Sequence, residues 1–271
     1  MREEDNRRLG RAHLWLSATT LHVGFRDMVA QSAAFSALDA FWAEGGRSFQ
    51  LDLCRETGTG VFNVRNAGVL TSWMRARRLA REKAVLALRL TPRSPSSGGC
   101  VTFLNQLRTQ VEQACSQLST DYLDLLVCRW TTPHLAVNDL AEAIDLLTRA
   151  GLIRYAVAED WPLWRIADLC VRASLARSAR VEAIQVTQPF GVHGNSESEE
   201  IGNVCRTYRL GLLLQTTESR HDVASNREPL ASLEPVLTSL VRAPDDFAST
   251  GIRENDSTEA PRPALTVGLP S

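Results

Sequence analysis

The feature that most constrains the fold is a regular alternation of short apolar runs with longer segments of helical periodicity. Apolar runs of strand length recur about every 30 to 40 residues, and each is followed by a segment with helical spacing of its apolar residues. The alternation predicts eight strands, at Ser17–Val23, Ser48–Leu53, Ala84–Leu90, Tyr122–Arg129, Tyr155–Ala158, Ala183–Gln188, Gly211–Gln215 and Leu265–Leu269.

Helices are predicted between these strands. The clearest are Asp27–Ala43, Val101–Leu118, Leu140–Arg149 and Ile166–Leu175. Strands that are apolar on both faces and separated by helices indicate a parallel sheet covered by helices. Eight such strands favour an α/β fold of the closed (β/α)8 TIM-barrel type, and 271 residues is a normal length for one barrel.

The predicted barrel forms one domain with an unusual end. Residues 1–242 carry barrel units one to seven, and residues 243–263 are predicted to be a mobile loop because they are rich in acidic residues, Ser, Thr and Pro. Residues 264–271 carry the last strand of the same domain. The chain stops directly after that strand, so the last barrel helix is expected to be absent.

Composition excludes several function classes. Thirty basic residues balance 31 acidic residues, which removes any compositional reason to expect nucleic-acid or polybasic-membrane binding. No stretch is long and apolar enough to span a membrane, and the charged N-terminus is unlike a secretory signal, so the expected location is cytoplasmic. The six cysteines form no CxxC pair and are expected to be reduced core thiols. No metal site is predicted.

Several ordered motifs resemble the aldo-keto reductase family of NADPH-dependent (β/α)8 barrels. Arg11–Ser17 is similar to that family's opening hairpin and first strand, and Ala37–Phe49 to its first helix and second strand. The strongest likeness is Gln117–Leu126, Gln-Leu-Ser-Thr-Asp-Tyr-Leu-Asp-Leu-Leu, while Ala150–Trp164 resembles the fifth-strand signature and Val181–Arg209 the sixth unit. The resemblance implies a cofactor across the C-terminal barrel mouth and a carbonyl substrate beside it.

The catalytic residues of the family do not carry over. Its aspartate, tyrosine, lysine and histidine are expected at positions that hold Gln50, Arg55, Arg89 and Arg129 in this chain. An arginine side chain cannot act as a general acid near neutral pH. The resemblance therefore implies that no catalytic residue is intact.

The cofactor positions implied by the family have changed as well. The serine and asparagine that hold the nicotinamide amide are Glu159 and Asp160 here, and only the glutamine, Gln185, remains. The aromatic residue that stacks on the nicotinamide is replaced by Gln215. This cofactor site is expected to be degenerate, with no cofactor bound, or NADP(H) only if the family activity survives.

Two interpretations of the mouth remain open. In the first, Glu159 and Asp160 neutralise Arg55, Arg89 and Arg129 and plug the former cofactor site. In the second, the arginines form a site for an anionic small molecule, since guanidinium groups suit phosphate and carboxylate. His22 is interpreted as structural because it has no evident partner. His134, His193 and His221 could form a metal site only if the loops that carry them converge.

Three functions follow from these interpretations. The preferred one is a non-redox pseudoenzyme that acts as a binding or accessory protein. The second is a repurposed lyase, isomerase or cyclase that acts on an anionic small molecule, and the third is an active but divergent NADPH-dependent oxidoreductase. The missing last helix would leave an apolar flank that favours a homodimer or a protein partner.

Overall fold

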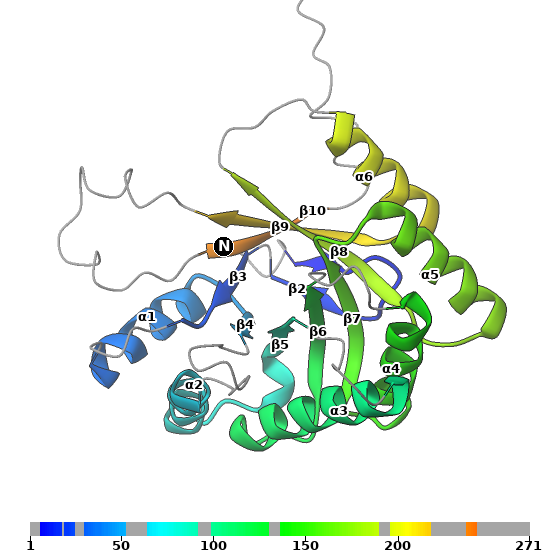
Figure 1. The fold of residues 1–271 in the computed structure, drawn as a ribbon. Coiled ribbons are helices and arrows are strands. Elements are labelled where there is room, and N and C mark those ends of the chain that lie inside the picture. Colours follow the sequence, from blue (N-terminus) through cyan, green and yellow to red (C-terminus); the bar gives the residue numbers. More distant parts are fainter. Residues whose placement is uncertain are drawn as a thin grey trace, which may run out of the picture.

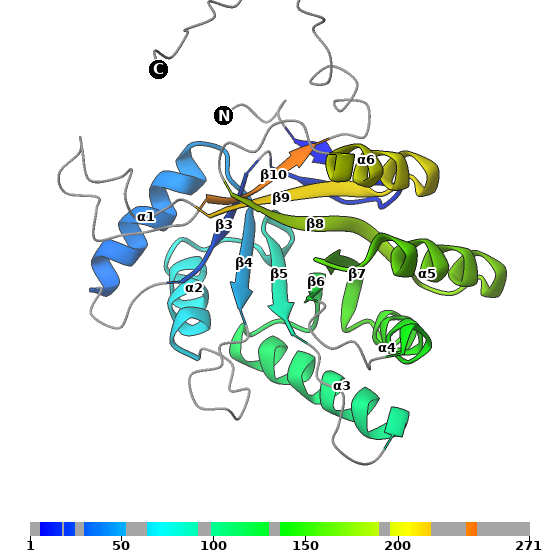
Figure 2. The same cartoon turned by 45° about the horizontal axis from the view of Figure 1, so that its top comes forward.

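The structure, a computed structural model, describes residues 6–17, 19–24, 30–52, 64–91, 99–129, 136–189, 196–217 and 237–242. In Figure 1 the strands form a strongly curved sheet, and the helices lie on its outer side. Turned by 45°, the same helices follow one another around the sheet in chain order (Figure 2). This arrangement is the predicted α/β barrel of the TIM type.

Eight strands close the barrel, in the order β10-β3-β4-β5-β6-β7-β8-β9. Seven of them, β3 to β9, run parallel to one another, as the alternation of strands and helices predicted. The barrel strands are β3 (Thr19–His22), β4 (Ser48–Asp52), β5 (Val85–Leu90), β6 (Leu123–Arg129), β7 (Ile153–Glu159), β8 (Val181–Pro189), β9 (Gly211–Thr217) and β10 (Leu237–Arg242).

The eighth strand differs from the predicted one. Strand β10 lies between β9 and β3 and runs antiparallel to both of them. It therefore occupies the position that the sequence analysis assigned to Leu265–Leu269. That segment and the predicted loop 243–263 lie outside the described residues, and the absence of the last helix stays a prediction.

The helices bury one apolar face each against the outside of the barrel. In α4 the buried residues are Val137, Leu140, Ala143, Ile144 and Leu147, which is the three-and-four spacing of a helix face. The α-helices of the described chain are α1 (Gln31–Ala43), α2 (Val64–Ala76), α3 (Gly99–Gln117), α4 (Val137–Arg149), α5 (Leu163–Ala176) and α6 (Ser196–Tyr208), with a short 3-10 turn at Arg81–Lys83.

A short hairpin fills the end of the barrel where the strands begin. Strands β1 (Arg7–Arg8) and β2 (Trp15–Leu16) pair antiparallel. Leu9, Leu14 and Leu16 between and within them are buried, and they pack against inward-facing residues of the barrel strands. The barrel-side residues of this inner cluster are Ala87, Leu125, Val127, Val157, Ala183 and Leu213. Because this end is filled with apolar side chains, a polar site can form only at the other end, the C-terminal mouth.

Candidate functional site: the barrel mouth

The inner face of the barrel turns from apolar to polar toward the C-terminal mouth. Side chains alternate between the two faces of a strand, so the neighbours of outward-packed residues point inward. Leu21, Leu51 and Leu88 belong to the outer core, which places His22, Gln50, Asp52 and Arg89 on the inner side. The inner side of the mouth also carries Arg129, Glu159, Gln185 and Gln215.

Arg89 and Glu159 form a bidentate ion pair across the mouth. Arg89 Nε lies 2.7 Å from Glu159 Oε2, and Arg89 Nη2 lies 2.5 Å from Glu159 Oε1. The Glu159 side chain is fully buried. Burial alone would lower the pKa of Arg89, but the hydrogen bonds and charges of Glu159 and Asp52 outweigh it and raise this pKa. Arg89 is therefore a fixed cation that cannot deliver a proton.

Asp52 connects the same arginine to His22. Asp52 and Arg89 are register partners on β4 and β5, and Asp52 Oδ2 lies 3.3 Å from Arg89 Nη1. The same oxygen lies 3.0 Å from Nε2 of His22, although the pair is not aligned as a straight hydrogen bond. Burial raises the pKa of Asp52, but His22 and Arg89 lower it by more, so this pKa falls below its ordinary value. Asp52 is thus held as a carboxylate between two basic side chains.

Arg129 and Asp160 form a second, more open pair at the ends of β6 and β7. Arg129 Nε lies 3.3 Å from Asp160 Oδ2, and the two side chains are 42% and 29% exposed. Asp160 has a φ of +53°, in the left-handed region that Asp adopts more readily than most residues. Its N–H donates to the carbonyl oxygen of Gln185. This turn directs the Asp160 side chain toward Arg129 at the rim.

Two buried amides complete the inner wall. Gln185 is fully buried, and its Nε2 donates to Gln215 Oε1 at 3.2 Å. Gln50 is 2% exposed. Four side-chain atoms of this region have no hydrogen-bond partner within the described part of the chain: Gln185 Oε1, Gln50 Nε2, Asp52 Oδ1 and His22 Nε2. Because buried polar atoms are almost always satisfied in native proteins, this concentration marks the mouth as the candidate site.

Four of the predicted residues have no described position. Arg55, His134, His193 and His221 lie outside the described residues. The one lysine of the chain, Lys83, lies in the 3-10 turn before β5, at the end of the barrel opposite the mouth.

None of the three tyrosines of the chain lies at the mouth. Tyr122 precedes β6 and lies between the guanidinium groups of Arg81 and Arg154. The Tyr155 hydroxyl accepts a hydrogen bond from the backbone N–H of His13, in the hairpin that fills the opposite end. Tyr208 is the last residue of α6.

The contact between His22 and Asp52 is the part of the site that sequence reasoning missed. His22 was interpreted as a histidine without a partner, and Asp52 was given no role. The signal that could have found them is strand alternation: His22, Gln50 and Asp52 all fall on the inner face, and His22 is the register partner of Gln50. Asp52, not Gln50, is the β4 side chain that contacts Arg89.

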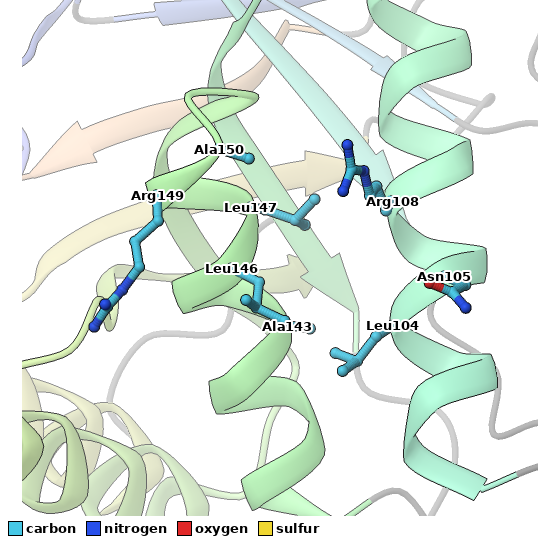
Figure 3. Close-up of a pocket in the computed structure, with 8 residues that line it drawn as sticks. All are labelled: Leu104, Asn105, Arg108, Ala143, Leu146, Leu147, Arg149 and Ala150. Atoms are coloured by element: carbon cyan, nitrogen blue, oxygen red, sulfur yellow. The ribbon is translucent and has the colours of Figure 1, made fainter.

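A hollow lies on the outer surface, away from the mouth. Figure 3 shows this groove between α3 and α4, with leucine side chains between the helices and Arg149 extending away from the gap. The groove has a volume of about 380 Å³ and is lined by Leu104, Asn105, Arg108, Ala143, Leu146, Leu147, Arg149 and Ala150. Both arginines already pair with acids of their own helices, Arg108 with Glu112 and Arg149 with Asp145. The groove therefore offers no group for chemistry.

Neither a candidate metal cluster nor a candidate membrane span occurs in the described residues. They contain no cluster of three or more His, Cys, Asp or Glu side chains that could hold a metal ion. Within the same residues, every helix is too short or too polar to cross a membrane.

Comparison with known proteins points to the same family that the sequence motifs resemble. A family model described as "Aldo/keto reductase family" matches residues 27–212. A Saccharomyces cerevisiae protein that carries an aryl-alcohol dehydrogenase name, AAD14, is 26% identical over 149 residues, which cover 52% of this chain and 38% of that protein. Norsolorinic acid reductase A of Aspergillus parasiticus is 25% identical over 146 residues, which cover 50% of this chain and 35% of the reductase. The matches thus cover less than half of these relatives.

Proposed function

This chain belongs to the aldo/keto reductase family, and we propose that it is a non-redox member whose barrel mouth binds a small polar molecule without reducing it. The observation that carries the proposal is the location of the tyrosines, which could donate a proton, and of the lysine. Carbonyl reduction in the family needs a tyrosine as proton donor and a lysine beside it. All three tyrosines and the one lysine of this chain lie away from the mouth.

The charged residues of the mouth support the same proposal. Arg89 is a fixed cation paired with Glu159 and Asp52, and Arg129 is paired with Asp160. Neither arginine can protonate a developing alkoxide, because a guanidinium group stays charged at any physiological pH. Loss of a general acid alone lowers rates by about 10² to 10⁴.

The described residues do not fit a nicotinamide. Gln185 still offers a free acceptor in Oε1. However, Glu159 is fully buried and engaged by Arg89, so the position of the family's serine offers no donor to the amide oxygen of the cofactor. The Arg89–Glu159 pair thus favours the interpretation in which an ion pair plugs the former cofactor site.

The balance of charge favours an uncharged ligand over an anionic one. Within the described mouth, the guanidinium groups of Arg89 and Arg129 face three carboxylates, those of Asp52, Glu159 and Asp160. An added anion would have to displace a carboxylate that already contacts its arginine. The unpaired amide atoms of Gln50 and Gln185 suit a neutral molecule with a carbonyl or hydroxyl group.

Calorimetric titration with NADPH tests the non-redox part. We expect no saturable binding at a cofactor concentration of about 1 mM and no NADPH oxidation with aryl aldehydes. Saturable binding together with steady turnover would overturn the proposal and establish the third function, an active divergent oxidoreductase.

A matched pair of aryl compounds tests the ligand. Phenylacetone and phenylacetate share a skeleton, and only the second is charged. We expect ligand-observed NMR to detect phenylacetone on the protein and not phenylacetate. The reverse result would favour the anionic ligand that the arginines first suggested, and binding of neither would contradict a small-molecule site for aryl compounds.

A further inference from the structure

His22 and Asp52 lie together at the mouth in a way that the binding function does not require. The two side chains come from neighbouring strands, β3 and β4, and Nε2 of the imidazole lies 3.0 Å from Oδ2 of the carboxylate. Both are partly exposed, 21% for His22 and 30% for Asp52. A histidine with one nitrogen next to a carboxylate is a common arrangement of a proton-transfer group.

The other edge of the imidazole, Cε1 and Nδ1, lies beside Gly24, two residues after the end of β3. A Cβ atom added at Gly24 would lie 3.0 Å from Cε1 and 3.1 Å from Nδ1 of His22. Glycine at this position therefore avoids the close contact that any larger residue would make with the edge that Asp52 does not face. If Nε2 carries the proton toward Asp52, then Nδ1 carries the lone pair, on the edge beside Gly24.

The neighbouring groups define what this imidazole can act on. Gln50 is the register partner of His22, it is 2% exposed, and its Nε2 has no acceptor within the described part of the chain. Its amide N–H can donate to an oxygen atom beside the imidazole. The charged groups around His22 in that part are Asp52 and, beyond it, Arg89, while the one titratable residue of β10, Arg242, lies at the far end of that strand.

We propose that His22 is a general base of the barrel mouth that removes a proton from the carbon next to a ketone or aldehyde group, with Asp52 as its positioning residue and Gln50 as the donor to the carbonyl oxygen. This inference rests on the proposed function, because it uses the same mouth and a neutral carbonyl compound. The class of reaction is enolisation or isomerisation, which needs neither an oxidant nor a reductant.

The step balances without any further reagent. Nδ1 of His22 takes the α-proton, and the electron pair of the broken C–H bond forms the C=C bond of an enolate whose negative charge lies on oxygen. The Gln50 amide stabilises that oxygen by a hydrogen bond. The imidazolium then returns a proton, which can come from solvent by exchange, to the carbon. The net result for a simple ketone is replacement of its α-hydrogen by solvent hydrogen.

Deuterium exchange into phenylacetone tests the proposal directly. In D2O, NMR should show α-hydrogen exchange faster with the wild-type protein than in buffer alone. We expect His22→Gln to lose at least about 10²-fold of the protein-dependent rate, the usual contribution of a general base. Asp52→Asn should lower the rate several-fold and leave phenylacetone affinity unchanged, because it acts through His22 and not on the ligand.

His13→Gln is the matched control. It makes the same chemical change in an exposed histidine of the hairpin, at the opposite end of the barrel, and should change the exchange rate by less than about twofold. Thermal melting of each variant establishes that it is folded, and Asp52→Asn provides a second test if His22→Gln does not fold.

The outcomes separate this inference from the proposed function. Exchange at the buffer rate in the presence of bound phenylacetone would overturn the inference alone. Exchange that persists in a folded His22→Gln variant would also overturn it. Failure of the wild-type protein to bind any neutral aryl carbonyl compound would instead count against the proposed function on which it rests.

Discussion

At the scale of single residues, the mouth is dominated by one buried charge and its partner. Glu159 has no exposed surface, and its carboxylate pairs with Arg89. Bringing a carboxylate into the barrel costs several kcal/mol of hydration, which only a well-aligned cation offsets. The pair therefore fixes the geometry of the mouth more than it stabilises the fold.

Replacement of one partner should cost far more than replacement of both. Arg89→Met leaves the Glu159 carboxylate buried without the guanidinium group that pairs with it. We expect a loss of about 3–5 kcal/mol in the free energy of unfolding. The double variant Arg89→Met/Glu159→Leu removes both charges and should recover most of that loss. Urea unfolding of the two single variants and the double variant measures the coupling. Additive losses would show that the pair is not coupled energetically.

Asp39 gives a prediction about acid stability. Its carboxylate accepts hydrogen bonds from Arg77 at 2.6 and 2.8 Å and from the Trp73 indole at 2.9 Å. The bonds to Arg77 and Trp73 lower the pKa of Asp39 to about 2. A lowered pKa in the folded state gives stability that is present above the unfolded pKa and is lost as pH falls toward 2. Asp39→Asn should therefore flatten the fall in urea midpoint between pH 5 and pH 2.5. An unchanged slope would contradict the assigned pKa.

At the scale of elements, the sequence predicted most strands and helices because their apolar spacing reports local burial. Strand β5 was expected at Ala84–Leu90 and is found at Val85–Leu90, and α4 begins three residues before the predicted Leu140. Strand β10 was not predicted. An antiparallel strand between two parallel neighbours breaks the βα alternation on which the prediction depended, so no periodic signal pointed to its position.

The candidate site could be predicted only in part, for a similar reason. Family spacing located Arg89, Arg129, Glu159 and Asp160 at the mouth, and the structure brings them together in pairs. The contact of His22 with Asp52 depends on the relative register of β3 and β4. Register is set by packing across the barrel, which a single sequence does not display.

The hairpin that fills the barrel end opposite the mouth allows a test of its close contact with the barrel, at Gly10. Gly10 has a φ of +50°, and a Cβ atom there would lie 2.5 Å from the carbonyl oxygen of Glu182 and 2.7 Å from the backbone nitrogen of Gly211. Both obstacles are backbone atoms and cannot rotate away. Gly10→Ala should thus lower the thermal midpoint by several degrees, because the hairpin must withdraw from β8 and β9.

Gly68 is the matched control for that substitution. It lies within α2, and a Cβ atom added there meets nothing within 4 Å. Alanine is a better helix former than glycine by about 1 kcal/mol, so Gly68→Ala should raise the thermal midpoint. Equal effects of the two substitutions would contradict the close contact of the hairpin with the barrel.

At the scale of the whole molecule, the barrel wall encloses thiols from several layers of the fold. Cys128 on β6 is fully buried, and burial raises the pKa of its thiol to about 12. Burial likewise raises the pKa of Cys205 to about 12, and those of Cys115 and Cys170 to about 11. All four are free thiols within the packed regions between sheet and helices. Their reactivity therefore reports the integrity of the whole barrel.

Thiol labelling at pH 8 measures that integrity. A thiol with a pKa of 11 to 12 is ionised at pH 8 to only about one part in 10³ to 10⁴, and the thiolate is the reactive form. We expect no more than two of the six cysteines to react with an aromatic disulfide reagent in the folded protein, and all six after unfolding in urea. In the variant Cys54→Ser/Cys100→Ser the folded protein should not react at all. Rapid labelling of all four remaining thiols under native conditions would mean that the barrel opens between its helices and its sheet. No smaller movement exposes thiols on β6, α3, α5 and α6 together.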